Sequence, residues 1–504
     1  MRKVLAKILD LLIPVAVFCI ALIIVGSLVS SRPFGHDESV YLTKARSWLE
    51  GTPADQYVIY RPLGMVSAGW VLLHLGNSEI IIRSFGVVFG AITLLFIYLL
   101  FKKMFNRWVA LGITTVVGTS TVFLREASQF FNDIPASGLL IGILLLLYIY
   151  YETAGKSKSV YFIALLSAFA FYLRYEVAPT LVVIGFLSLL ILLPKFKQKT
   201  NASFTKLQTT LIVSIFLLIP HFLQSYIWTK DPFGILGLAG EVAGRKYIGD
   251  GLVDYIKWLP SETGGWVMGV TAILGIIATF TILARKKTLQ NQENLLWLGG
   301  IGLLSFIIIG LTADAEPRHI FFSMTLLSGV GIASVYSLVK EKTKFLANLL
   351  ITLLITNAVL SGVFHFEKTD SFFKELESDP YTLAFSEASN AISSDSASMN
   401  GCAIWSPVYR PTLSWYTKCN ILPIGDEDRF ERDYLVNSGK PYYSVVLTKL
   451  QESQISQNEA IKFNVDLTEV FRTNNLSKSS RGDLVVYRIT RTDEIGQGND
   501  WINW

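Results

Sequence analysis

Charged residues are scarce for a chain of this length. They make up only 16% of the 504 residues, whereas soluble globular proteins carry about 25%. The charges that do occur are concentrated in the last third of the chain, so the first two thirds are even more apolar than the average. This distribution excludes a protein that is soluble throughout and predicts an integral membrane protein with a more polar C-terminal part.

The long apolar runs predict membrane-spanning helices. A helix needs about 20 mostly apolar residues to cross roughly 30 Å of hydrocarbon. We therefore predict a polytopic α-helical membrane protein with a multi-span domain over 1–365 and a small α/β domain over 366–504. In the latter, a helix is expected near 381–393 and strands at 402–406, 442–448 and 484–490. About eleven spans are predicted, the fifth and sixth as a tight hairpin: 11–30, 84–101, 108–124, 135–151, 160–173, 177–194, 208–227, 265–284, 294–311, 319–339 and 346–364.

The basic residues predict the orientation. One set of alternate connections holds 18 Lys and Arg residues, whereas the opposite short connections hold only Arg125, Arg174 and Arg318. By the positive-inside rule, the N-terminus is cytoplasmic and the C-terminal domain is extracytoplasmic, in the plasma membrane. The net charge of +5 is then a topology signal, and it requires no nucleic acid as a partner.

Cysteines are also few. Cys19 lies in the first predicted span, whereas Cys402 and Cys419 lie in the predicted outer domain. A disulfide can persist outside the cell. Cys402 and Cys419 are therefore either joined in a disulfide or present as two separate buried thiols.

The two long connections, 31–83 and 228–264, both lie on the predicted outer side, which suggests that the functional side faces outward. The first contains an amphipathic helix candidate at 38–50, followed by Gly51 as a C-cap. The second is rich in glycine, and we expect irregular, mobile backbone there.

No predicted span has a charged residue in its middle. Arginines and carboxylates gather instead at the outer span ends and in the outer loops, from which they would converge on one cavity. Arginine binds phosphate through a planar fork. A carboxylate can accept a proton from an attacking hydroxyl or amine, or hold a divalent cation such as Mg²⁺ or Mn²⁺. The pattern predicts a site for an anionic, lipid-linked substrate.

Four segments carry a family resemblance. Gly35-His-Asp-Glu-Ser-Val-Tyr41 resembles the D-E-x-x-Y motif of the GT-C glycosyltransferases, which take sugars from polyprenyl or dolichyl phosphate. Tyr60-Arg-Pro-Leu-Gly64 resembles the K-P-P-L segment of the branch with protein O-mannosyltransferases and the aminoarabinose transferase. Phe131-Asn-Asp-Ile-Pro135 resembles the second acidic motif of that branch, and Arg318-His319 stands where it often has Arg-Tyr.

The resemblance implies a role for each matching residue. Asp37 would be the general base toward a protein, lipid or glycan acceptor, with Glu38 in support. Asp133 would be the second acidic residue, and Asp37 and Asp133 are the candidate metal ligands. Arg61 and Arg318 would contact the donor phosphate. The wider predicted substrate-binding set is Arg61, Arg318, Tyr41, Arg125, Arg174 and His319.

Other interpretations are open for these residues. Asp37 and Asp133 each suit a helix N-cap, and Arg61 suits an interfacial residue whose charge reaches water. Arg174 and Glu176 can also pair with each other to tie a tight turn. A transporter or flippase for an anionic lipid is the alternative function, although the uncharged span middles argue against it. A membrane anchor for the C-terminal domain would not need eleven spans.

Overall fold

The computed structural model describes residues 2–54, 57, 59–153, 157–196, 201–241, 247–259, 264–284, 292–312, 316–396, 402–406, 410–422, 441–449, 465–473, 476 and 482–491. The chain forms two compact units. The first comprises Met1–Val29, Ile59–Met65 and Ile80–Ser371. The second comprises Ser30–Val58, Val66–Glu79 and Phe372–Trp504, so most of the first long loop belongs to the same unit as the C-terminal part.

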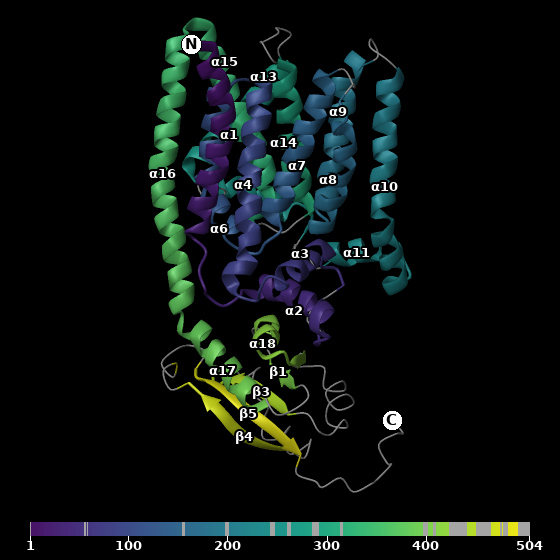
Figure 1. Cartoon of the computed structure of the whole chain (residues 1–504), viewed down its shortest axis with the longest axis vertical. Helices are drawn as coiled ribbons and strands as arrows, with labels where there is room; N and C mark the ends of the chain where they lie inside the picture. Colours follow the sequence, from purple (N-terminus) through teal and green to yellow (C-terminus); the bar gives the residue numbers. More distant parts are fainter. Residues whose placement is uncertain are drawn as a thin grey trace. The chain divides into compact units, whose positions relative to one another are not determined.

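The first unit is a bundle of apolar helices (Figure 1). Each of the eleven predicted spans overlaps a helix. The described exceptions are residues 27–30 at the end of the first span, 119–120 within the third and 265 at the start of the eighth. The helices are α1 (Arg2–Gly26), α4 (Glu79–Met104), α5 (Arg107–Gly118), α6 (Thr121–Ala127), α7 (Asp133–Glu152), α8 (Ser159–Leu173), α9 (Val177–Phe196), α10 (Asn201–Thr229), α13 (Trp266–Ala284), α14 (Gln292–Thr312), the 3-10 helix η1 (Pro317–Ile320), α15 (Phe321–Lys342) and α16 (Lys344–Ser378).

Length and composition support a polytopic membrane protein. Among the described residues, eight helices are long and apolar enough to cross a membrane, or nine if α5 and α6 form one span. Their outer faces are apolar as well: Leu211, Ile215 and Phe216 of α10 are 63%, 54% and 63% exposed. A soluble protein rarely exposes so much contiguous apolar surface, whereas lipid solvates it.

The predicted span at 108–124 is not one straight helix. It bends by 67° between α5 and α6. Ser120 begins the second helix by accepting a hydrogen bond from the backbone N–H of Phe123 at 3.3 Å. A uniformly apolar run concealed this break, because hydropathy does not respond to a capping residue within the run.

Small residues allow the core helices to pack closely. α13 and α15 meet at Gly275 and Gly331, where an added Cβ would collide with backbone atoms of the facing helix. Thr271 and Ser328 hydrogen-bond across the same interface at 2.6 Å. Membrane helices use small residues and hydrogen bonds in this way because lipid provides no hydrophobic drive for their association.

The second long connection is more ordered than predicted. Its described residues form two short helices, α11 (Gly234–Glu241) and α12 (Asp250–Trp258). Gly249 precedes α12 with φ = 95°, a conformation that favours glycine. The expectation of irregular backbone was therefore wrong for these residues, because the glycines lie within and beside helices.

The second unit contains α2 (His36–Glu50), most of α3 (Leu63–Leu73) and a mixed α/β fold. The latter comprises α17 (Pro380–Ser396), α18 (Arg410–Thr417) and five strands: β1 (Ala403–Trp405), β2 (Asn420–Leu422), β3 (Tyr442–Leu447), β4 (Val465–Arg472) and β5 (Leu484–Arg491). The strand order is β2-β1-β3-β5-β4. β1 is parallel to β2 and β3, whereas β5 is antiparallel to β3 and β4.

The core of the mixed fold lies between α17 and the sheet. Phe385 and Ile392 of α17 pack with Val445 of β3 and Val486 of β5. The predicted helix and the three predicted strands are confirmed. β2, β4 and α18 were not predicted; α18 connects β1 to β2, because parallel neighbours require a crossover.

Cys402 and Cys419 form a disulfide. Cys402 precedes β1, and its carbonyl accepts a hydrogen bond from the backbone N–H of Asn420 in β2 at 2.9 Å. The disulfide closes a loop of the chain that contains α18. Of the two alternatives that the sequence left open for these cysteines, the disulfide is therefore the correct one.

Removing this crosslink should destabilise the second unit. We expect Cys402→Ser with Cys419→Ser to lower the free energy of opening of the β1 and β2 amides by about 3 kcal/mol, because a loop of this length loses that much unfolded-state entropy when it is closed. Native-state hydrogen exchange measures it. Cys19→Ser, which removes the free cysteine, is the control, and equal exchange in both variants would refute the prediction.

Candidate functional site

Asp133 is the centre of a charged cluster in the first unit. It occupies the first turn of α7 and is only 2% exposed. A carboxylate is favoured there because the positive end of the helix dipole lies at the N-terminus. Asn132, not Asp133, is the N-cap, so the capping interpretation of Asp133 was wrong. The side-chain amide of Asn132 donates to the carbonyl of Leu173 at 2.8 Å, which ties this turn to the end of α8.

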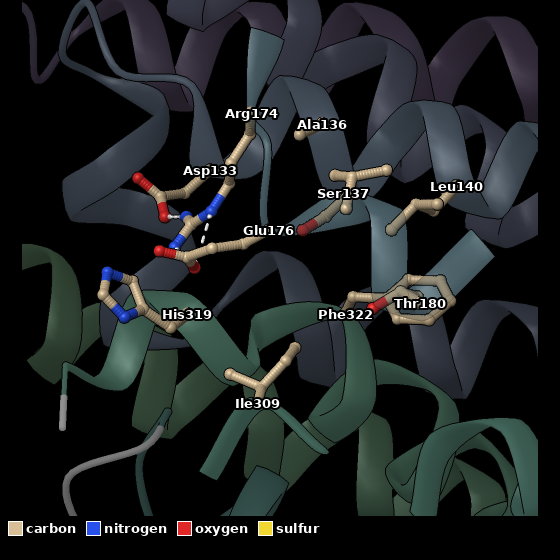
Figure 2. Close-up of a pocket in the computed structure, with 11 residues that line it drawn as sticks. Asp133, Ala136, Ser137, Leu140, Arg174, Glu176, Thr180, Ile309, His319 and Phe322 are labelled. Carbon is tan, nitrogen blue, oxygen red and sulfur yellow. Dashed lines mark hydrogen bonds and ion pairs between the residues drawn. The ribbon is translucent and has the colours of Figure 1, made fainter. Parts of the chain in front are cut away.

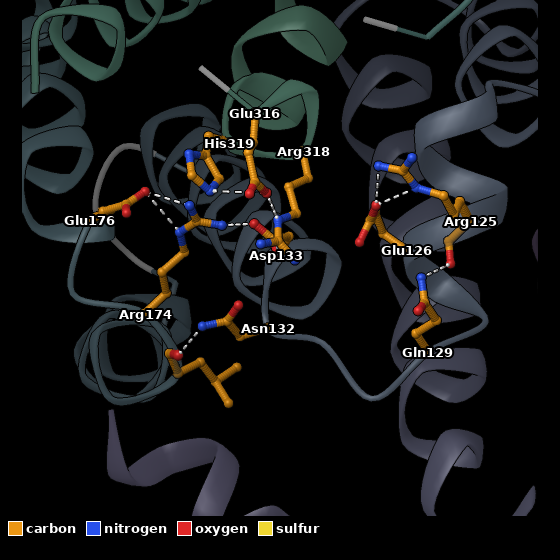
Figure 3. A network of polar contacts seen from close by, with 11 residues as sticks. Arg125, Glu126, Gln129, Asn132, Asp133, Arg174, Glu176, Glu316, Arg318 and His319 are labelled. Carbon is orange, nitrogen blue, oxygen red and sulfur yellow. Dashed lines mark hydrogen bonds and ion pairs between the residues drawn. The ribbon is translucent and has the colours of Figure 1, made fainter. Parts of the chain in front are cut away.

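Arg174 directly follows α8 and reaches Asp133. Its guanidinium forms ion pairs with both Asp133 and Glu176 (Figure 3). Gly64 packs against the backbone of Tyr172 and Leu173 so closely that a Cβ there would collide with it. The segment that carries Arg61 therefore lies against the end of α8.

Arg318 and His319 approach Asp133 from η1. The Nε of Arg318 lies 3.8 Å from Oδ2 of Asp133 and also pairs with Glu316. The guanidinium of Arg318 lies 5.0 Å from the ring centre of Phe131. His319 Nε2 is 3.9 Å from Glu316 Oε2 (Figure 3). Four predicted residues, Asp133, Arg174, Arg318 and His319, thus come together from three connections.

Burial differs within the cluster. The side chains of Arg174, Arg318 and Asp133 are 12%, 17% and 2% exposed, whereas those of Glu176 and Glu316 are each 43% exposed. Asp133 therefore pairs with both arginines in the protein interior. The more exposed Glu176 pairs with Arg174, and the more exposed Glu316 pairs with Arg318. Because two oxygens of a phosphate can accept the paired hydrogen bonds of a guanidinium, as a carboxylate does, a phosphate can replace a glutamate on either fork.

A small pocket, with free space of about 20 Å³, adjoins the cluster. One side is charged, with Asp133, Arg174, Glu176 and His319, and the other is apolar. Figure 2 shows Leu140, Ile309 and Phe322 across from the ion pairs. The lining of this pocket therefore places charged side chains beside an apolar wall.

Glu176 lies in the turn between α8 and α9. Burial raises its pKa, but the guanidinium of Arg174, with His319 and Arg318, outweighs this effect and lowers the pKa from 4.5 to about 2. The charged form of Glu176 is therefore favoured in the folded protein throughout the neutral range.

This shift predicts a pH dependence of stability. A lowered folded-state pKa gives a stabilisation that is complete above the unfolded pKa and is lost as the pH falls through the folded pKa. The difference in Tm between the wild type and Glu176→Gln should be constant from about pH 8 to 5 and shrink from 4.5 toward 2. Glu341→Gln, at the exposed end of α15, controls for general charge effects. A difference that already shrinks between pH 7 and 6 would contradict the lowered pKa.

Arg125 and Arg61 are the other predicted residues of the first unit. Arg125, on α6, forms an ion pair with the buried Glu126 at 2.8 Å, and its carbonyl accepts a hydrogen bond from Gln129 (Figure 3). Arg61 precedes α3, and its guanidinium lies 5.6 Å from the ring centre of Tyr60.

Asp37, Glu38 and Tyr41 lie on α2 in the second unit. The helix begins at His36 with Gly35 as the N-cap, so Asp37 is not the cap that the sequence allowed. Glu38 is fully buried, and its carboxylate accepts a hydrogen bond from the N–H of Gly35 at 2.9 Å. Tyr41 is 3% exposed. Gly51 ends the helix with φ = 72°, which confirms the predicted C-cap.

The sequence predicts Asp37 and Asp133 as metal ligands. These two residues belong to different units. In the described part of the chain, no three His, Cys, Asp or Glu side chains are grouped to hold a metal ion. Glu176 and Glu316 also belong to the cluster. The ion pair of Glu176 with Arg174 confirms the pairing that the sequence suggested, whereas Glu316 was noted only among the outer charges.

Comparison with known proteins gives one family match and several fold matches. Residues 62–223 match the family described as dolichyl-phosphate-mannose-protein mannosyltransferase. No curated protein sequence gives a significant match. The matched segment contains Asp133 and Arg174 but ends before Arg318.

Two solved structures share the fold. ArnT from Cupriavidus metallidurans, bound to undecaprenyl phosphate, has a TM-score of 0.67 at 12% identity, covering 94% of this chain and 97% of ArnT. The oligosaccharyltransferase AglB from Archaeoglobus fulgidus, with an inhibitory peptide and a dolichol-phosphate, has a TM-score of 0.53 at 9% identity, covering 82% of this chain and 64% of AglB. The resemblance to the GT-C glycosyltransferases that the motifs predicted is therefore confirmed.

Proposed function

We propose that the chain is a glycosyltransferase that moves a single sugar from a polyprenyl- or dolichyl-phosphate donor to a protein, lipid or glycan acceptor. The observation that carries the proposal is the buried Asp133 between Arg174 and Arg318, at the mouth of a pocket with an apolar wall. The fold is shared with proteins whose structures were solved with undecaprenyl phosphate and with a dolichol-phosphate.

The arginines would hold the leaving phosphate. In the proposed reaction, an acceptor hydroxyl or amine attacks the anomeric carbon of the donor, and the bond between that carbon and a phosphate oxygen breaks. The electron pair of that bond goes to the phosphate, where Arg174 and Arg318 stabilise the added charge. Asp133 keeps both forks in place. Arg61, Arg125, Tyr41 and His319 complete the proposed substrate-binding set.

Asp37 would accept the proton of the attacking group. It lies in the first turn of α2, and the Glu38 carboxylate beside it is fixed by its bond to Gly35. A carboxylate in this role contributes a factor of about 10² to 10⁴ to the rate. The resemblance to the family implies inversion at the anomeric carbon. A divalent cation, Mg²⁺ or Mn²⁺, held by Asp37 or Asp133 is part of the proposal and is tested below.

The proposed location follows from the basic connections. The positive-inside rule places the N-terminus in the cytoplasm and the C-terminal domain outside the plasma membrane. The charged cluster, made from connections on the opposite side to those basic loops, would then face outward. The donor would be taken from the outer leaflet.

The experiment is sugar transfer by the purified protein in lipid, with radiolabelled polyprenyl-phosphate sugars and a membrane extract as acceptor. Transfer of the label from the donor to the acceptor supports the proposal. Repeating the assay with a chelator shows whether a metal ion is required. Movement of intact donor between leaflets without loss of its sugar would instead indicate a flippase. Donor that is neither consumed nor moved would refute the proposal.

A further inference from the structure

The C-terminal part of the chain contacts the helix that carries Asp37. Tyr416, in α18, accepts a hydrogen bond on its hydroxyl from the N–H of Phe34 at 3.0 Å and donates one to Oε1 of Glu79 at 2.6 Å. The rings of Phe34 and Tyr416 are stacked with centroids 6.4 Å apart. Thr412 donates to the carbonyl of Phe34 at 3.3 Å. The segment just before α2 is therefore fixed to α18 by both backbone and side-chain contacts.

The other end of α2 is held by Arg46. Its guanidinium donates to the carbonyls of Ser414, at 2.8 Å, and of Trp415, and lies 4.6 Å from the centre of the Trp415 ring. These carbonyls belong to the last turn of α18, where the helix dipole favours a positive charge. The carbonyl of Ser414 also accepts a hydrogen bond from the N–H of Lys418 at 2.9 Å. Arg46 is only 4% exposed, and burial lowers its pKa to about 10, although Glu50 opposes the shift. It therefore stays charged at neutral pH.

α18 is itself rigidly held. The disulfide between Cys402 and Cys419 closes the chain around it. Ser414 donates to the carbonyl of Cys419 at 3.0 Å. A third link to α2, between Lys418 and Glu50 at 2.7 Å, follows the end of α18. α2 thus rests on a short helix that is crosslinked to the sheet.

We propose that α18 is a positioning element for the acidic first turn of α2, so that the C-terminal part fixes Asp37 for proton transfer. Tyr416 and Arg46 are the positioning residues, since they hold α2 on either side of that turn. The proposal rests on the proposed function only in its statement about Asp37. The placement of the turn by α18 is independent of the reaction.

Tyr416→Phe is the sharpest test, because it removes both hydroxyl hydrogen bonds and keeps the stacked ring. We expect amide exchange at residues 39–42 to become about tenfold faster. We expect kcat to fall about tenfold and KM for the donor to change less than twofold, because the residues proposed to hold the donor phosphate are elsewhere in the chain. Arg46→Lys, which keeps the charge and loses the fork, should act in the same direction.

Tyr443→Phe is the matched control. Its hydroxyl also makes a 2.6 Å hydrogen bond, to Asp395, but within the sheet region and away from α2. Exchange at 39–42 that is equal in Tyr416→Phe and Tyr443→Phe would overturn the proposal. So would faster exchange in Tyr416→Phe with an unchanged kcat, because the contact would then be structural only. If the wild type consumes no donor, the proposed function fails, and the exchange comparison still tests the placement.

Discussion

Asp37→Asn should lower kcat for sugar transfer about 1,000-fold, with KM for the donor nearly unchanged. Asparagine has the shape of aspartate but cannot accept the proton of the attacking group, and general bases contribute factors of about 10² to 10⁴. The fold of α2 should survive, since Gly35 is the N-cap and Glu38 makes the capping contact. Initial rates at saturating donor measure the effect.

The control for this prediction is Glu387→Gln, which neutralises an exposed carboxylate of the same unit on α17. It should transfer sugar at the wild-type rate. If Asp37→Asn retains a rate within about threefold of the wild type, well below the range for a lost general base, Asp37 is not the base.

Asp133→Asn should lower kcat/KM about 100-fold. Its carboxylate lies between Arg174 and Arg318, and an amide cannot balance both charges. The two forks would separate, and a shift of about 1 Å in a positioning group can cost about 100-fold in rate. Tm should fall as well, because breaking a buried ion pair strands its partner. Steady-state kinetics and thermal unfolding measure the two effects.

Glu152→Gln is the matched control for Asp133→Asn. Glu152 lies at the opposite end of the same helix and forms an ion pair with Lys103 at 2.8 Å. Its loss should leave kcat/KM unchanged. A loss of Tm in Asp133→Asn without a loss of kcat/KM would show that the cluster is structural.

The sequence was sufficient to predict the membrane bundle and much of the second unit. Each predicted span overlaps a helix because an apolar run in lipid must satisfy its own backbone hydrogen bonds. The break at Ser120 was missed because a cap within an apolar run leaves hydropathy unchanged.

The candidate site was partly predictable. Asp133, Arg174 and Arg318 could be grouped because they lie in connections on one side of a bundle. The pairing of Arg174 with Glu176 could be anticipated as well, because one residue separates them. The pairing of Arg318 with both Glu316 and Asp133 could not, because it depends on the side-chain geometry of separate turns. The contact of Arg46 with Trp415 spans 369 positions of sequence, and neither residue carries a local signal of the other.

In the proposed function, the cluster of Asp133, Arg174 and Arg318 binds the phosphate of the donor. The most direct test is equilibrium binding of radiolabelled undecaprenyl phosphate to the wild type and to Glu316→Gln with Arg318→Gln. The double variant removes an arginine together with its carboxylate partner, so Asp133 stays paired with Arg174. We predict an affinity about 30-fold weaker in the variant, the effect of losing a charged hydrogen bond. Equal affinity in the two proteins would contradict the account.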